Sequence, residues 1–144
     1  MPLAVSNYEE VVDWMLATIA AEGRAYLTAA AVNLVMSARD DERVRAAVLD
    51  ATLAVPDGQP LVWAMNALGH DLSSRVYGPD LMARFCARAA EHAIPIYLYG
   101  GRSEQALAQL EGRLRARFAG LRTRGATLAK RARRLPARPV FSGA

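Results

Sequence analysis

A Pro-Asp-Gly turn at residues 56–58 places a single carboxylate where an enzyme could use a base. The apolar run Thr52–Val55 before it predicts a strand, and Pro60 after it is typical of the first turn of a helix. We therefore expect Asp57 at the carboxyl end of a strand, where open α/β sheets bind their ligands. There it could act as a general base on a substrate hydroxyl. Asp-Gly is also a common turn dipeptide, so a purely structural interpretation competes with this one.

Two further turns carry groups that suit a phosphorylated substrate. Arg75 opens the segment Arg75–Met82, and its cation could stabilise a phosphate group, although a solvated surface arginine is the simpler interpretation of this residue taken alone. Gly100 and Gly101 end an apolar run, and glycine lets the backbone approach a phosphate closely before a helix whose first N–H groups are free. The competing interpretation is a plain strand-to-helix connection with Ser103 as N-cap.

Helical and strand patterns alternate along the chain. A capping box at Ser6 and Glu9 starts a first helix, which ends at Gly23, and a later helical stretch is broken near Asp40–Asp41. The other expected elements are strands at 25–28, 52–55, 94–99 and 121–124, and helices at 60–68, 78–92 and 105–118. This order predicts an α/β fold, a Rossmann-like three-layer domain with a mainly parallel sheet. The near-continuous apolar character of 94–99 predicts a strand covered on both faces.

Composition narrows the class of protein. The chain has 144 residues, of which 53% are hydrophobic, and this argues for one packed domain over disorder. No apolar run reaches the ~20 residues of a membrane span, and the first residues do not resemble a signal peptide. The one cysteine, Cys86, fits a reducing cytoplasm and is interpreted as a small buried hydrophobe. The two histidines, His70 and His92, stand apart from any cluster of metal ligands, so no metal site is expected.

Charge is divided unevenly along the chain. Residues 1–111 hold 8 basic and 14 acidic residues, whereas residues 112–144 hold 10 basic and no acidic ones. We expect the stretch 126–144 to be a basic, disordered or poorly packed tail. It could attract anionic lipid, bind nucleic acid, or be an extension without selected function. The lack of interleaved aromatic residues argues against nucleic acid.

Three segments together resemble one protein family. The segments are Val55–Trp63, Arg75–Met82 and Ile94–Gly101, which match in order and spacing the signatures of the WecG/TagA/CpsF glycosyltransferases, glycosyltransferase family 26. The resemblance runs from about Tyr8 to Gly125. Family members normally continue further, so residues 1–125 look like the amino-terminal portion of the family domain, with its carboxyl-terminal part truncated and residues 126–144 as the tail.

The resemblance implies a hexosyltransferase. It would move an N-acetylated amino sugar from a UDP-sugar to an undecaprenyl-diphosphate-linked sugar, with inversion and without metal or other cofactor, in the synthesis of surface polysaccharide or teichoic acid. It would work in the cytoplasm as a peripheral protein at the inner membrane face, and a homo-oligomer is left open. Asp57 and Arg75 take the catalytic positions in this resemblance. The expected substrate-binding residues are Thr28, Asn33, Gly58, Gly100 and Gly101.

One departure from the family pattern bears on activity. The family has a Thr-x-Asn-like element that lines the acceptor pocket, and its two polar positions fall on Ala29 and Ala31 here, with Thr28 and Asn33 nearby but out of register. Alanine offers no side-chain hydrogen bond to an acceptor. An inactive truncated remnant of such an enzyme is therefore one alternative function, and a basic-tailed module that binds polyanions is another. The sugar, the acceptor and the intactness of the gene stay open.

Overall fold

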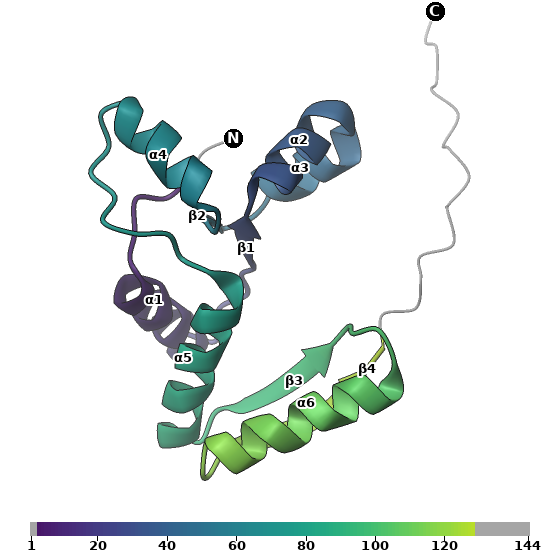
Figure 1. Cartoon of the computed structure of the whole chain (residues 1–144). Coiled ribbons are helices and arrows are strands. Elements are labelled where there is room, and N and C mark those ends of the chain that lie inside the picture. Colours follow the sequence, from purple (N-terminus) through teal and green to yellow (C-terminus); the bar gives the residue numbers. More distant parts are fainter. Residues whose placement is uncertain (1–2, 129–144) are drawn as a thin grey trace, which may run out of the picture. The chain divides into compact units, whose positions relative to one another are not determined.

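A computed structural model describes residues 3–128 of the chain, which fall into two compact units divided between Phe85 and Cys86 (Figure 1). The expectations for the basic tail beyond Leu128 lie outside the described residues. In chain order the elements are α1 (Tyr8–Ala20), β1 (Leu27–Ala30), α2 (Val32–Asp40), α3 (Glu42–Leu49), β2 (Leu53–Pro56), α4 (Gln59–Ala67), α5 (Gly78–Glu91), β3 (Pro95–Tyr99), α6 (Glu104–Arg117) and β4 (Arg122–Thr127).

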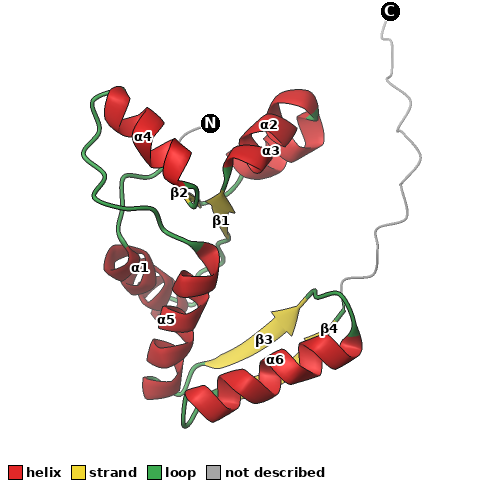
Figure 2. Ribbon diagram, viewed as in Figure 1, coloured by secondary structure: helices red, strands yellow, loops and turns green. Residues whose placement is uncertain are grey.

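Helices and strands alternate (Figure 2), which confirms the α/β class. Strand β4 runs two residues past the predicted domain boundary at Gly125.

The first helix begins one residue later than its sequence pattern suggested. Asn7, not Ser6, is the N-cap of α1, because its side chain accepts a hydrogen bond from the Glu10 N–H at 3.0 Å. The Glu10 carboxylate accepts in return from the Asn7 N–H at 3.2 Å. This reciprocal pair is a capping box, and it fixes which residue opens the first turn of the helix.

The expected break in the second helical stretch is confirmed at Asp41. Its carboxylate accepts from the N–H of Arg43 at 2.8 Å and so caps α3. The Arg45 guanidinium donates to the carbonyls of Ala38 and Arg39, which are among the last of α2 and lack partners within that helix. Side-chain hydrogen bonds thus satisfy both helix ends at the break.

The sheet of the first unit consists of β1 and β2, which are parallel. Leu27 pairs with Leu53, and the register continues to Ala30 and Pro56. Strand β1 starts two residues later than the pattern predicted, at Leu27, which is the first residue that pairs with β2. Alternate residues of a strand face the same side, and the odd-numbered ones here pack against α1 and the start of α5. The buried members of that cluster are Val11, Val12, Val55, Val76 and Leu81.

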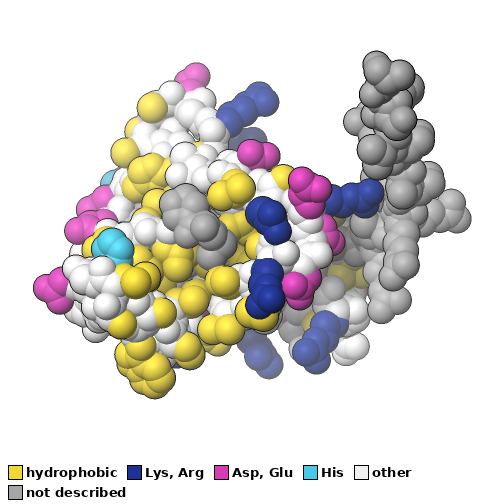
Figure 3. Space-filling model, turned by 90° about the horizontal axis from the view of Figure 1, so that it is seen from above, with side chains coloured by type: hydrophobic (Ala, Val, Ile, Leu, Met, Phe, Trp, Pro, Cys, Tyr) yellow, Lys and Arg dark blue, Asp and Glu magenta, His cyan; other side chains and the backbone are white. Residues whose placement is uncertain are grey.

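Helix α4 is only half buried. Val62 and Met65 pack against Leu72. Trp63 and Leu68 are 65% and 81% exposed, so these two side chains do not lie in the core of the described residues. Hydrophobic side chains form a broad area on the face seen in Figure 3.

The second unit holds a parallel pair, β3 and β4, packed with α6. Ile96 and Leu98 alternate with Tyr97 and Tyr99, which are 56% and 72% exposed. The expectation that this strand is covered on both faces is therefore wrong for the described residues. The near-continuous apolar run hid the alternation, because tyrosine counts as apolar by composition while its hydroxyl tolerates water.

Substitution by alanine should have opposite effects on stability at two glycines, Gly125 in β4 and Gly112 in α6. Gly125 has φ +148°, and an added Cβ would lie 2.9 Å from the ring of Tyr97. We expect Gly125→Ala to lower the free energy of unfolding by about 1–2 kcal/mol through backbone strain. Gly112 is a helix-interior residue with open space around it, so Gly112→Ala should raise that free energy by about 0.5–1 kcal/mol. Urea denaturation of both variants checks the pair, and equal shifts would contradict the φ assignment.

Cys86 behaves as the buried hydrophobe predicted from sequence. It is 1% exposed, and burial raises the pKa of its thiol. Because the thiolate is the reactive form, we expect the native chain at pH 8 to react with Ellman's reagent at least ~10-fold more slowly than the chain in denaturant. Comparable rates in both states would show that the thiol is accessible.

Candidate active site

Asp57 lies at the carboxyl end of a parallel strand. The Pro56–Ala30 pair is the last in the register of β1 and β2, and the Asp57 N–H donates to the Ala30 carbonyl at 2.9 Å. Gly58 follows as the N-cap of α4. It contributes no side chain, and an added Cβ there would be in ordinary contact with Ala31, at 3.8 Å from its Cα. The strand-turn-helix arrangement expected around Asp57 is therefore present.

The Asp57 carboxylate points toward the first residue of α5. Its Oδ1 accepts from the Gly78 N–H at 3.4 Å, and an added Cβ on Gly78 would lie 3.9 Å from Oδ2. A helix N-terminus carries partial positive charge, which makes a carboxylate favourable there. One carboxylate oxygen is thus held, while the other can accept a proton. The pattern before Pro79 predicts that a helix starts at Gly78, but nothing in the sequence indicates that its amide meets Asp57.

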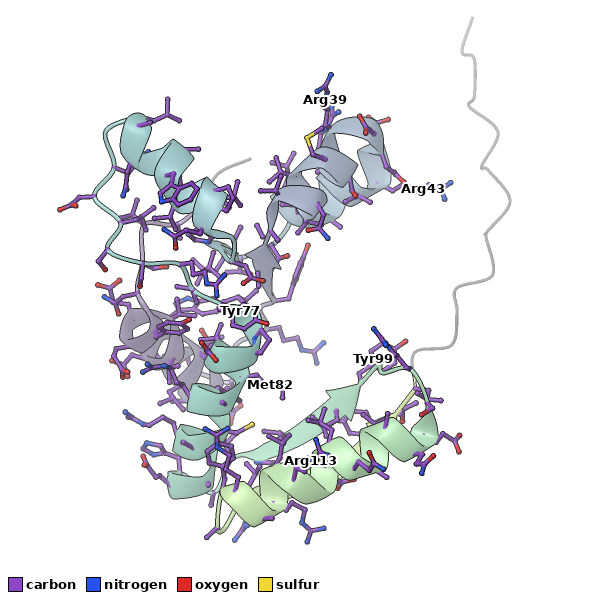
Figure 4. All side chains as sticks on the ribbon, viewed as in Figure 1. Arg39, Arg43, Tyr77, Met82, Tyr99 and Arg113 are labelled. Atoms are coloured by element: carbon purple, nitrogen blue, oxygen red, sulfur yellow. The ribbon has the colours of Figure 1, made fainter. Side chains whose placement is uncertain are left out.

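Arg75 belongs to the segment that brings Gly78 to Asp57. The next residue, Val76, is fully buried and donates its N–H to the Pro56 carbonyl at 2.8 Å, which fastens the segment beside the end of β2. The Arg75 guanidinium lies 4.8 Å from the centre of the Tyr77 ring. Tyr77 is labelled in Figure 4, near the start of α5. Arg75 is exposed, and among residues 3–128 no carboxylate forms an ion pair with it. Its charge is therefore available to an anionic ligand.

Two alanines border the Asp57 turn. An added Cβ on Gly78 would lie 3.5 Å from the Ala29 Cβ, and one on Gly58 would lie 3.8 Å from the Ala31 Cα. They are the two positions on which the sequence resemblance places the polar residues of the Thr-x-Asn-like element. The Ala29 side chain packs against the hydrophobic cluster of the first unit, and neither alanine offers a side-chain hydrogen bond at this turn.

The structure does not bring Thr28 and Asn33 to the Asp57 side chain. Thr28 pairs with Ala54, and alternation along β1 puts its side chain on the opposite face from Ala29. Asn33 is exposed in the first turn of α2, where its side-chain oxygen accepts from the Leu34 N–H at 2.9 Å. Their proposed substrate contacts stay predictions without support from the geometry.

Gly100 and Gly101 belong to the second unit. Both have positive φ, +113° and +106°, so the turn after β3 needs glycine. Ser103 caps α6 by accepting from the Ala106 N–H at 3.1 Å, as its structural interpretation predicted. A cavity of about 660 Å³ on α6 and β4 is lined by Glu104 and Glu111, which disfavours an anion there. A phosphate at this turn therefore stays a prediction.

Metal ligands are not clustered in the described part of the chain. Residues 3–128 contain no group of three or more His, Cys, Asp or Glu side chains placed to hold an ion. His70 is exposed. Near the end of β2, the Asp57 carboxylate could transfer a proton, and the cation of Arg75, next to Val76, could stabilise negative charge.

The model of the glycosyl transferase WecG/TagA/CpsF family matches residues 1–130. The match includes the Asp57 turn, the Arg75–Gly78 segment and the glycine turn after β3. It covers far more than half of the chain. The chain therefore belongs to the WecG/TagA/CpsF family of glycosyl transferases, which act on a sugar donor and an acceptor.

Proposed function

We propose that this chain is an inverting hexosyltransferase that moves an N-acetylated amino sugar from a UDP-sugar to a lipid-diphosphate-linked sugar. The observation that carries the proposal is the position of Asp57. It follows a parallel strand, faces the first amide of α5, and lies in the segment that matches a glycosyltransferase family. The match supports glycosyl transfer, and the geometry supports Asp57 as the proton acceptor.

The reaction would be a single displacement. The free oxygen of the Asp57 carboxylate takes the proton from an acceptor hydroxyl, and the acceptor oxygen attacks the anomeric carbon of the donor. The bond from that carbon to the UDP oxygen breaks, and UDP leaves with the electron pair. Arg75 balances the negative charge on the departing diphosphate, because its cation has no carboxylate partner among residues 3–128. The products are UDP and an inverted glycoside.

A lipid-linked acceptor would bring the protein to the cytoplasmic membrane face as a peripheral protein. Within residues 3–128, no helix is long and apolar enough to cross a bilayer. The exposed Trp63 and Leu68 on α4 follow the Asp57 turn directly, and such side chains favour a membrane interface or a partner protein. We include both a contact with the membrane interface and a contact with a partner protein in the proposal.

Mass spectrometry of the lipid product tests the proposal. The chain is incubated with an undecaprenyl-diphosphate-linked sugar and, in separate reactions, UDP-N-acetylglucosamine, UDP-N-acetylmannosamine and UDP-glucose. The expected result is addition of one N-acetylated hexose, with one UDP released per product. If none of the donors yields a heavier lipid, the transferase proposal is wrong.

A second candidate is donor binding without transfer. The feature in its favour is that Ala29 and Ala31 lie beside the Asp57 turn, at the two positions where the sequence resemblance leads us to expect polar residues. A chain of this kind would bind UDP in calorimetry and form no product. The double substitution Ala29→Thr with Ala31→Asn separates the two functions, because it should create transfer in an inactive binder.

A further inference from the structure

Tyr8, the first residue of α1, touches the segment that carries Arg75 and Gly78. Its hydroxyl accepts from the Tyr77 N–H at 3.0 Å, across 69 positions of sequence. Its ring packs against the hydrophobic cluster formed by α1, β2 and the start of α5. The capping box at Asn7 sets the start of α1 and therefore the place of Tyr8.

Three successive amides of the segment each have a different acceptor. The Val76 N–H donates to the Pro56 carbonyl, the Tyr77 N–H to the Tyr8 hydroxyl, and the Gly78 N–H to the Asp57 carboxylate. The distances are 2.8, 3.0 and 3.4 Å in that order. The Tyr8 bond is the middle one, directly between the backbone anchor at Val76 and the contact with Asp57. It is also supplied by a side chain, so a single substitution can remove it.

Tyr8 is itself held in place by α5. The Arg84 guanidinium lies 4.5 Å from the centre of the Tyr8 ring, and it donates to the Glu9 carboxylate at 3.0 Å. Arg84 and Glu9 are 50% and 68% exposed, so their ion pair adds little stability. Its effect is to fix the plane of the ring, and with it the position of the hydroxyl.

From these contacts we propose that Tyr8 is a positioning residue for the reaction. Its hydroxyl holds the Tyr77 amide, and this keeps the next amide, that of Gly78, against the Asp57 carboxylate. Only the expected effect on kcat rests on the proposed function. The positioning itself is a property of the ground state and can be observed without turnover.

The test compares Tyr8→Phe with Tyr26→Phe in the full chain. The first change keeps the ring that packs under Arg84 and removes only the acceptor of the Tyr77 N–H. The second is a matched control, because the Tyr26 hydroxyl likewise bonds to the backbone, here as donor to the Ala47 carbonyl, at the other end of β1 from the Asp57 turn. Both variants lose one hydroxyl and one hydrogen bond to the backbone.

We expect Tyr8→Phe to lower kcat about 10-fold, because small displacements of catalytic groups have effects on this scale. The Kd for UDP should change less than ~3-fold, since the hydrogen bond from the Val76 N–H to the Pro56 carbonyl still holds the backbone next to Arg75. In NMR spectra, the amide signals of Tyr77 and Gly78 and the carboxyl carbon of Asp57 should shift. Tyr26→Phe should leave kcat and these three signals as in the wild type.

Two results for Tyr8→Phe would overturn the proposal. Unchanged Tyr77 and Gly78 signals in Tyr8→Phe overturn the anchoring, and a wild-type kcat despite shifted signals overturns the catalytic role. If the wild-type chain transfers no sugar, the proposed function fails and the NMR comparison alone decides the positioning. If Tyr8→Phe does not fold, Arg84→Met replaces it, because loss of the cation over the ring should shift the same signals. Unshifted signals in Arg84→Met overturn the proposal.

Discussion

Replacing Asp57 by asparagine should reduce kcat at least ~100-fold, the usual scale for loss of a general base. Asparagine keeps the size of the side chain and an oxygen that can accept from the Gly78 N–H, so the turn should keep its geometry. What it loses is the ability to take a proton from the acceptor. The Kd for UDP should therefore stay within about twofold of the wild type, measured by calorimetry, while kcat is measured from UDP release.

A matched control for this change is Asp13→Asn. Asp13 is exposed on α1, and the same charge is removed there without touching the turn after β2. Its kcat should equal that of the wild type. If Asp57→Asn also turns over at the wild-type rate, Asp57 is not the base and the proposed mechanism loses its central residue.

The second large effect is expected on donor binding. Arg75→Ala should weaken UDP binding about 10-fold, because charge-assisted hydrogen bonds to phosphate contribute about 1.5–3 kcal/mol and this side chain is exposed. Binding of the free sugar, which has no phosphate, should not change. Arg75→Lys should recover part of the affinity, since lysine restores the charge without the two-pronged geometry of arginine. Calorimetric titration with UDP measures all three proteins.

An exposed arginine elsewhere provides the control. Arg43 lies on α3, and Arg43→Ala removes one positive charge away from the Asp57 turn (Figure 4). Its affinity for UDP should match that of the wild type. If the two alanine variants lose affinity equally, the effect is one of net charge, and Arg75 has no specific contact with the diphosphate.

Element types could be predicted from sequence, whereas their ends could not. The Asp40–Asp41 break was predictable because aspartate is a strong N-cap, and Asp41 does cap α3. The start of α1 was missed by one residue, because Ser6 with Glu9 and Asn7 with Glu10 both have capping-box spacing. Only the folded backbone distinguishes two such overlapping signals. The tyrosines of β3 were misjudged for a different reason, since composition does not show which face of a strand has a neighbour.

The sequence predicts those parts of the candidate site that depend only on neighbouring residues in the chain. Asp57 at the end of a strand and Gly58 before a helix follow from local pattern, and both are found there. The role of Gly78 could not be read from sequence, because its amide meets Asp57 across 21 positions. Thr28 was assigned to the site by proximity in sequence, and strand alternation turns its side chain to the other face.

The anomeric configuration of the transferred sugar tests the central claim most directly. The claim is that one carboxylate, Asp57, acts as base in a single displacement. The measurement is an NMR spectrum of the product formed by the full chain from an α-linked UDP-N-acetylhexosamine, in which the coupling constants of the anomeric proton and carbon report the configuration. The account predicts a β-linked product. An α-linked product would mean that configuration is retained, and it would contradict the mechanism even if Asp57 proved essential.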